Sequence, residues 1–343
     1  MQKLDTTSNT PGKRGLRGDL FGGITSAIVT LPGNVALGML ALGALGPSLT
    51  GTAILAGMAA GIYASITACL FSNTQIMLSG PGAASSLILA GVLAKLLTAP
   101  EFAGAPDLAG TMLTIIFLIV LLSGLFQLLF GALKLGNIVK FISYPVVAGT
   151  INGSALLIFL DQAGPFLGLG HVNIFEIPDN FSQIRMPAVS ICAFTVLLNI
   201  FGNKLIPRVP ASLLGILGGS ALYYSLIAAG LAHDIGETLG IIQIELPNLE
   251  LLSEFFTVFK NPATLTHFPL IFGAALTIAL VNSLYSLLAV VSLRNQTERQ
   301  PNYNFELIGQ GLGNILGACL GGLPANAKIA RTMVSYNSGG RTR

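Results

Sequence analysis

Two short stretches decide the fold of this 343-residue chain: SGPGAASS at residues 79–86 and GGLPANAKIART at residues 321–332. In each, glycine and proline stand directly before a short apolar run. Proline suits the first turn of a helix because its missing N–H would be unpaired there, and it biases the preceding residue towards extended backbone. Each stretch therefore predicts an extended lead-in, then proline, then a short helix that begins inside an apolar layer.

The chain around these stretches is strongly apolar. Hydrophobic residues make up 52% of the sequence and charged residues 9%, whereas a soluble domain has roughly 25% charged residues. About 20 apolar residues cross a bilayer as a helix, which satisfies its own backbone hydrogen bonds. The sequence predicts an all-α polytopic membrane protein with helices at residues 20–44, 51–71, 81–98, 110–133, 141–161, 187–203, 211–232, 267–292, 305–322 and 325–336.

The distribution of charge predicts the orientation of the chain. Residues 1–19 are polar and basic, and we expect them to form a cytoplasmic tail. With the N-terminus inside, most lysines and arginines fall on inner loops and most acidic residues on outer loops, as the positive-inside rule requires. We expect an integral protein of the cell (inner) membrane, surrounded by the lipid bilayer. No basic face with groove-reading elements is recognisable, so we expect no nucleic-acid partner.

Residues that carry covalent or metal chemistry are few. The three cysteines lie in separate apolar runs, and the three histidines are scattered over outer loops. Neither set has the spacing of a metal site, and no pairing of a nucleophile with a general base is recognisable. We therefore expect no enzyme, no cofactor and no metal site.

The two proline-initiated helices suggest an inverted repeat. In the predicted topology, helix 81–98 runs from inside to outside and helix 325–336 runs the opposite way. Helix starts expose unpaired N–H groups and the positive end of the helix dipole, so two starts that meet at mid-membrane form an anion site. Paired Gly/Pro-interrupted segments also mark transporter binding sites. We expect residues 20–232 to form the first repeat and residues 267–336 to begin the second.

Six sequence blocks in order give the chain a specific resemblance. They are RGDLFGGITSAIVTLP (17–32), LSGPGAASS (78–86), NIVKFISYPVVAGTINGSALLIFLDQAGPFLG (137–168), IPRVPASLLGILGG (206–219), NFELIGQGLGNILGACLGGLP (304–324) and RTMVSYNSGGRTR (331–343). Together they resemble the membrane domain of the SulP family of anion permeases, whose members carry sulfate, bicarbonate and related anions. The resemblance covers the whole chain.

The resemblance implies a fourteen-helix, seven-plus-seven inverted-repeat transporter fold in which a core bundle moves against a gate bundle. The inorganic anion would lie between the starts of the third and tenth helices. In the family a cytoplasmic STAS domain usually follows, whereas this sequence stops before an eleventh helix. We expect residues 20–343 to be a SulP-type domain without STAS, as a fragment, a truncated product or a chain completed by a partner. Relatives dimerise, so a homodimer is one assembly to test.

The resemblance also implies the residues that line the anion site. On the third helix these are Ala83, Ala84, Ser85 and Ser86, for which close helix packing is the alternative explanation. On the tenth helix these are Asn326, Ala327, Lys328 and Arg331. Arg331 matches the family pattern, whereas Asn326 and Lys328 depart from it. The alternative for Lys328 is that it snorkels or pairs with a carboxylate.

Two further departures concern the coupling ion. Many relatives have an acidic residue, tied to a coupling sodium ion or proton, where this chain has Tyr285, and some have a sodium-binding hydroxyl where it has Ala289. A neutral tyrosine does not replace a carboxylate. We therefore expect no family-type sodium site, with Lys328 as a built-in cation instead.

The remaining expectations concern the cavity and the activity. We expect Asn34, Tyr63, Asn282 and Tyr285 to line the cavity, although packing explains Asn34 and Tyr63 equally well. The main functional hypothesis is secondary active transport of an anion by alternating access. The alternative is a truncated, non-transporting or regulatory relative, because a fixed cation can also bind an anion too tightly to release it.

Overall fold

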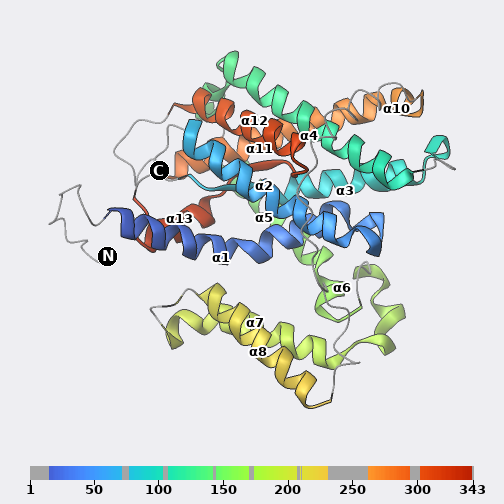
Figure 1. Cartoon of the computed structure of the whole chain (residues 1–343), viewed down its shortest axis with the longest axis vertical. Coiled ribbons are helices and arrows are strands. Elements are labelled where there is room, and N and C mark those ends of the chain that lie inside the picture. Colours follow the sequence, from blue (N-terminus) through green and yellow to red (C-terminus); the bar gives the residue numbers. More distant parts are fainter. Residues whose placement is uncertain are drawn as a thin grey trace. The chain divides into compact units, whose positions relative to one another are not determined.

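The structure is a computed structural model of the whole chain (Figure 1). It describes residues 15–71, 77–102, 107–141, 144–169, 174–206, 209, 211–230, 262–293 and 302–341. The chain divides into two compact units: unit 1 comprises residues 1–141 and 244–343, and unit 2 comprises residues 142–243. The two units are described separately.

Unit 1 contains both stretches that begin with glycine and proline. Its helices are α1 (Gly15–Leu42), α2 (Thr50–Phe71), α3 (Ala83–Leu97), α4 (Leu108–Ala132), α10 (Pro262–Thr266), α11 (Phe268–Leu293), α12 (Tyr303–Cys319) and α13 (Ile329–Asn337). Its strands are β1 (Ser79–Pro81) and β2 (Ala325–Ala327). Short 3-10 turns lie at Gly43–Leu45, Pro47–Leu49, Pro100–Phe102 and Leu135–Phe141.

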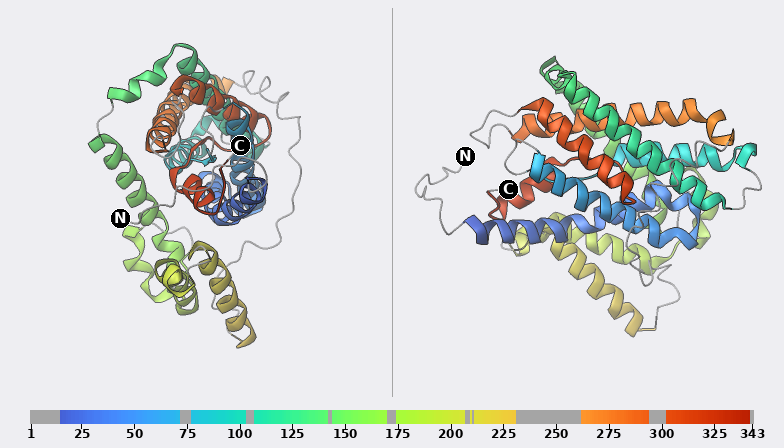
Figure 2. Two further views of the ribbon diagram at one scale, coloured as in Figure 1. Left: turned by 90° about the vertical axis from the view of Figure 1, so that its left-hand side faces the viewer. Right: turned by 45° about the horizontal axis from the view of Figure 1, so that its top comes forward.

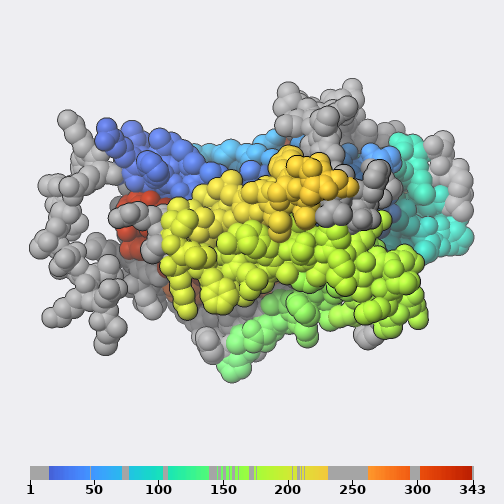
Figure 3. Space-filling view, turned by 90° about the horizontal axis from the view of Figure 1, so that it is seen from below, coloured from blue at the N-terminus to red at the C-terminus, as the bar shows by residue number. Residues whose placement is uncertain are grey.

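The regular elements described in unit 2 are all helices. Its helices are α5 (Tyr144–Asp161), α6 (Ala163–Phe166), α7 (Met186–Leu205) and α8 (Ala211–Ala228), with 3-10 turns at Ile174–Glu176 and Pro178–Gln183. Figure 3 looks onto α7 and α8. Large apolar side chains on these helices are exposed, among them Ile200 (62%), Leu205 (65%) and Leu217 (59%). Exposed side chains of this kind suit helices that face lipid.

Each of the ten predicted helices has a counterpart in the structure. Among the described residues, α1, α2, α4 and α11 are long and apolar enough to cross a membrane. α1 begins at Gly15, so residues 15–19, predicted as the end of the tail, are helical. The outer-loop charges predicted at residues 234–254 lie outside the described residues.

The predicted starts of the two short helices are wrong. The third predicted helix was placed from residue 81, but α3 begins at Ala83, and Pro81 is the last residue of β1. The tenth was placed from residue 325, but residues 325–327 form β2 and α13 begins at Ile329. The reason is that the two lead-ins pair with each other, which satisfies backbone groups that a longer helix would have paired internally.

α4 packs against α11 and α12 in unit 1 (Figures 1 and 2). The apolar core of the unit includes Leu93 of α3, Ile116 of α4 and Ile278 of α11, each fully buried. Between α4 and α12 the backbones touch: a Cβ on Gly124 would lie 2.8 Å from the carbonyl oxygen of Gly311, and the reverse also holds. Small residues allow membrane helices to approach this closely.

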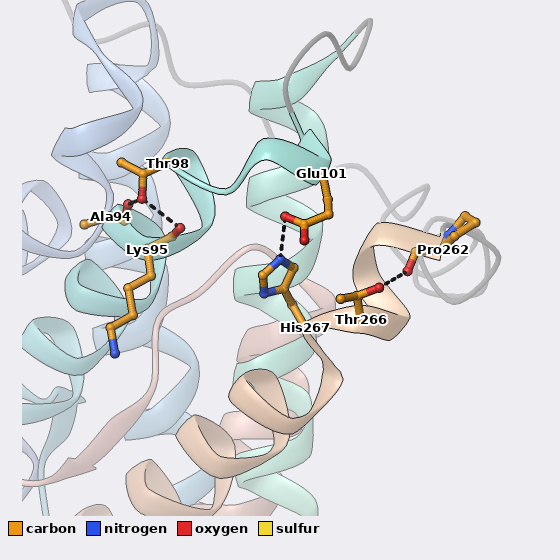
Figure 4. Close-up of polar contacts among 7 residues, drawn as sticks. All are labelled: Ala94, Lys95, Thr98, Glu101, Pro262, Thr266 and His267. Atoms are coloured by element: carbon orange, nitrogen blue, oxygen red, sulfur yellow. Dashed lines mark hydrogen bonds and ion pairs between the residues drawn. The ribbon is translucent and has the colours of Figure 1, made fainter.

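Two contacts each join a pair of helix ends, and the predicted topology places the two ends of each pair on the same side of the membrane. At the predicted outer side, His267 Nε2 lies 3.3 Å from Glu101 Oε2, between the end of α3 and the start of α11 (Figure 4). A hydrogen bond from its own backbone amide, and then the one from His267, hold the pKa of the Glu101 carboxyl below its ordinary value. At the predicted inner side, the Arg341 N–H donates to Asp19 Oδ1 (2.6 Å).

Candidate anion site

β1 and β2 pair with each other as an antiparallel two-stranded ribbon within unit 1. The Cα pairs are Ser79 with Ala327, Gly80 with Asn326 and Pro81 with Ala325. Beyond them, the Gly82 N–H donates to Pro324 O (3.0 Å) and the Lys328 N–H donates to Leu78 O (2.8 Å). The N-cap residues of the two helices, Gly82 and Lys328, therefore lie at opposite ends of the ribbon, about 13 Å apart along the strands at about 3.3 Å per residue.

Each strand of a two-stranded ribbon has one unpaired edge, and in an apolar layer that edge needs partners. On β1, a side chain of α2 supplies them. The Ser65 hydroxyl donates to Ser79 O (2.9 Å) and accepts from the Ser79 N–H (3.4 Å). One hydroxyl thus satisfies both backbone groups of Ser79.

On β2, side chains of α11 and α12 do the same. Asn314 Oδ1 accepts from the Ala325 N–H (2.7 Å), and Asn314 Nδ2 donates to Ala325 O (3.1 Å) and to Gln127 Oε1 of α4 (2.5 Å). The Ser286 hydroxyl of α11 accepts from the Ala327 N–H (3.1 Å). The amide of Asn314 therefore replaces the neighbouring strand that β2 lacks.

Asn314 is one of three polar residues that the sequence prediction missed. Glu306, Gln310 and Asn314 recur at four-residue intervals along α12, so they share one face of the helix. All three are buried, and Gln310 Nε2 donates to Ser79 Oγ (2.8 Å) and to Glu306 Oε1 (2.9 Å). A polar stripe on an otherwise apolar membrane helix is the signal that could have identified them.

Both helix starts present free backbone donors. In α3 and α13 the first intrahelical bonds are made by Ser86 and Thr332. The three N–H groups before each of them, at residues 83–85 and 329–331, have no hydrogen-bond partner among the described residues. Unpaired N–H groups and the positive end of a helix dipole favour an anion. These donors are the feature on which the predicted anion site is based; the site itself stays a prediction, and both helices begin later than predicted.

Three predicted site residues lie together between α3, α11 and β2. Asn282 Oδ1 accepts from Ser85 Oγ (2.5 Å) and from Asn326 Nδ2 (2.9 Å), and all three side chains are at most 2% exposed. A Cβ on Gly82 would lie 2.7 Å from Ser85 Oγ and 2.8 Å from Asn326 Nδ2, so glycine leaves room for this cluster. The side chains of Ser85 and Asn326 thus join α3 and β2 to Asn282 of α11.

Other predicted residues lie nearby with varied exposure. Ala83 and Ala84 are half-buried at the first turn of α3, whereas Ser86 is fully buried on the same helix. Tyr63, on α2, is half-buried. Ala327 is buried in β2, where it contributes to an apolar cluster.

Lys328 is the N-cap of α13, between β2 and the helix. Its backbone is extended (φ −119°, ψ 108°), and its side chain is half-buried. Within the part of the chain that the structure describes, the single ion pair joins Glu101 to His267, so the Lys328 ammonium has no carboxylate partner there. The expected alternative of a carboxylate pair for Lys328 is therefore not found among the described residues.

Arg331 lies one turn further along α13 and is bound differently. Its Nη1 donates to Asn34 Oδ1 of α1 (2.5 Å). α13 packs against α1 (Figures 1 and 2). Asn34 is predicted to line the cavity, and in the structure its side-chain oxygen accepts a hydrogen bond from the guanidinium of Arg331.

Of the two positions that hold coupling-ion ligands in relatives, the one at Ala289 is apolar here. Ala289 is fully buried and packs in a cluster with Met77, Val290 and Ala327. Tyr285 is half-buried one turn earlier on α11. Across the described ranges, no three His, Cys, Asp or Glu side chains are grouped as a metal site would require.

Comparison with known proteins identifies a family. A sequence model described as "Sulfate permease family" matches residues 16–343. The bicarbonate transporter BicA of Synechocystis sp. is 30% identical over 336 residues, which are 96% of this chain and 54% of that protein. BicA of Picosynechococcus sp. is 28% identical over 336 residues, 96% of this chain and 55% of that protein. This chain thus spans about half the length of these curated relatives.

A solved structure agrees with the sequence comparison. The transmembrane domain of a cyanobacterial bicarbonate transporter BicA superposes with a TM-score of 0.77 at 29% identity, covering 97% of this chain and 80% of that one. The helical membrane fold is therefore confirmed, whereas the inverted repeat stays a prediction. The chain belongs to the sulfate permease (SulP) family, as its sequence blocks predicted.

Proposed function

We propose that this protein carries a small inorganic anion, of the sulfate or bicarbonate class, across the cell membrane by alternating access. The family match and the names of the BicA relatives support an anion as the substrate. Every candidate site residue belongs to unit 1, which supports a cycle in which this unit carries the bound anion. The cytoplasmic N-terminus and a homodimer belong to the same proposal.

The observation that carries the proposal is the lack of a carboxylate partner for Lys328 among the described residues. An ionised lysine in the middle of a bilayer costs about 3 kcal/mol even on lenient scales, and Lys328 has no carboxylate partner among the described residues to offset that cost. An anion at 4 Å would be attracted by about 4 kcal/mol at an effective dielectric near 20. A bound anion therefore supplies the counter-charge that the described side chains do not.

Tyr285 and Ala289, together with Lys328, support transport without a coupling sodium ion. Tyr285 has no carboxylate, and the side chain of Ala289 supplies no oxygen. Ala289 packs in an apolar cluster, whereas hard cations prefer oxygen ligands. Lys328 would then supply the positive charge that relatives take from solution.

Reconstitution tests the proposal. The purified full-length protein, in proteoliposomes, should accumulate labelled sulfate or labelled bicarbonate above the level of protein-free vesicles, and an excess of the unlabelled anion should abolish that uptake. Vesicles that show no such uptake would refute transport. If those anions still raised the melting temperature of the same preparation, the non-transporting alternative would hold instead.

A further inference from the structure

Arg331 is enclosed by groups that are small or neutral. Its Nη1 donates to Asn34 Oδ1, and a Cβ on Gly80 of β1 would collide with that same nitrogen. A Cβ on Gly33 of α1 would lie 3.3 Å from Nη2. The guanidinium therefore fits into a space that exists because residues 33 and 80 have no side chain.

Asn34 is itself fixed by its surroundings on α1 and α2. It is 7% exposed. A Cβ on Gly61 would collide with its Nδ2, and a Cβ on Gly57 would collide with its backbone oxygen, both too close for a side chain. Any shift of Asn34 towards α2 is therefore blocked, so its Oδ1 presents a fixed acceptor to Arg331.

The acceptor is an amide and not a carboxylate. Asparagine and aspartate have nearly the same size, and aspartate would bind the guanidinium more strongly, in a charge-assisted pair. It would also cancel the positive charge of Arg331, whereas the neutral amide leaves that charge intact. Among the described residues no carboxylate forms an ion pair with Arg331.

We propose that Asn34 is a positioning residue, which with Gly33 and Gly80 holds the charge of Arg331 in place beside the anion site without neutralising it. Arg331 then acts on the anion through its electric field, and Lys328 is the cation free to contact the anion. This inference rests on the proposed anion function. A purely structural role for Asn34, as a tie between α1 and α13, is the competing explanation.

Substitution of Asn34 separates the two explanations. Asn34→Asp keeps the shape and the acceptor oxygen but cancels the charge of Arg331, so we expect KM for sulfate or bicarbonate uptake to rise roughly tenfold or more, with no loss of melting temperature. Asn34→Ala keeps the charge but frees the guanidinium, so KM should rise by less than in Asn34→Asp. Asn337→Asp, which adds a carboxylate at an exposed position on the same helix, should keep the wild-type KM.

Wild-type KM in Asn34→Asp would overturn the proposal, because a structural tie tolerates a stronger bond. If Asn34→Asp does not fold, Arg331→Gln and Asn34→Ala decide the question: both should raise KM with kcat little changed, Arg331→Gln by more. Wild-type KM in either of them would equally overturn the proposal. An absence of anion uptake in the wild-type protein would instead refute the proposed function, so the two failures are distinguishable.

Discussion

Lys328 is the residue that most distinguishes this chain from the family pattern. Its backbone N–H is used by the ribbon, through the bond to Leu78 O, while its ammonium has no carboxylate among the described residues. The fold therefore fixes where the side chain begins and leaves its charge available. Arg331, three residues later, has its guanidinium bound to Asn34. Of the two cations, Lys328 is the one for which no hydrogen bond from the side chain is found among the described residues.

Substitution of Lys328 should weaken anion binding more than it weakens the fold. In Lys328→Gln we expect the affinity for sulfate or bicarbonate to fall roughly ten- to a hundredfold, because a Coulomb attraction of a few kcal/mol is lost. The melting temperature should stay the same or rise, since an unpaired charge is removed from an apolar layer. Titration of anion-dependent thermal stabilisation measures both effects.

Lys95→Gln is the matched control for this prediction. Lys95 is an exposed lysine near the end of α3, away from the ribbon (Figure 4). Its loss should leave the anion affinity unchanged. If Lys328→Gln bound the anion as well as the wild type did, Lys328 would have no role in the site.

Strand β2 is the element whose position matters most, because it presents Lys328. Among the described residues, its outer edge is held by side chains and by no third strand. Removing one of those side chains leaves buried backbone groups unpaired. In Asn314→Ala, the N–H and C=O of Ala325 lose their partners, and we expect the free energy of unfolding to fall by about 1–3 kcal/mol. Thermal melting in detergent, followed by circular dichroism, checks this.

Asn199→Ala provides the comparison for that measurement. Asn199 is an exposed residue of α7 beside Gly215 of α8, and its Nδ2 donates to a carbonyl of its own helix, that of Thr195. Removing this exposed amide should change stability little. Equal losses in the two variants would show that Asn314 has no special part in holding β2.

The short elements of the site also show what sequence can and cannot predict. The order of helices and the two special stretches were predictable, because long apolar runs and Gly/Pro punctuation are local signals. The strand at residues 325–327 was not, because its stability comes from pairing with β1, nearly 250 residues earlier in the sequence, and from Asn314. A local rule that places proline at a helix start does not include such distant partners.

The same limit applies to the site residues. Sequence placed Asn282, Ser85 and Asn326 near an anion, and the structure brings them together as a hydrogen-bonded cluster. Which atom donates to which depends on the packing of three separate elements, and no sequence spacing encodes that. The polar stripe at Glu306, Gln310 and Asn314 was predictable from sequence, because the four-residue spacing of these residues is a local pattern.

For the whole molecule, the two end contacts of unit 1 make the predicted topology testable. Glu101 should face the outside and Asn337 the cytoplasm. In a cysteine-free background, a membrane-impermeant maleimide applied to intact cells should label Glu101→Cys and spare Asn337→Cys until the membrane is permeabilised. The reverse labelling would show that the orientation is inverted, and equal labelling of both would show that the two ends share one side.

The central claim for the whole molecule is anion transport that needs no sodium ion, because Lys328 supplies the positive charge. The most direct test is the initial rate of labelled sulfate or bicarbonate uptake by the full-length protein in proteoliposomes, measured as sodium is replaced stepwise by N-methylglucamine. We predict the same rate at every sodium concentration, including zero. Uptake that occurs only with sodium present would contradict the account.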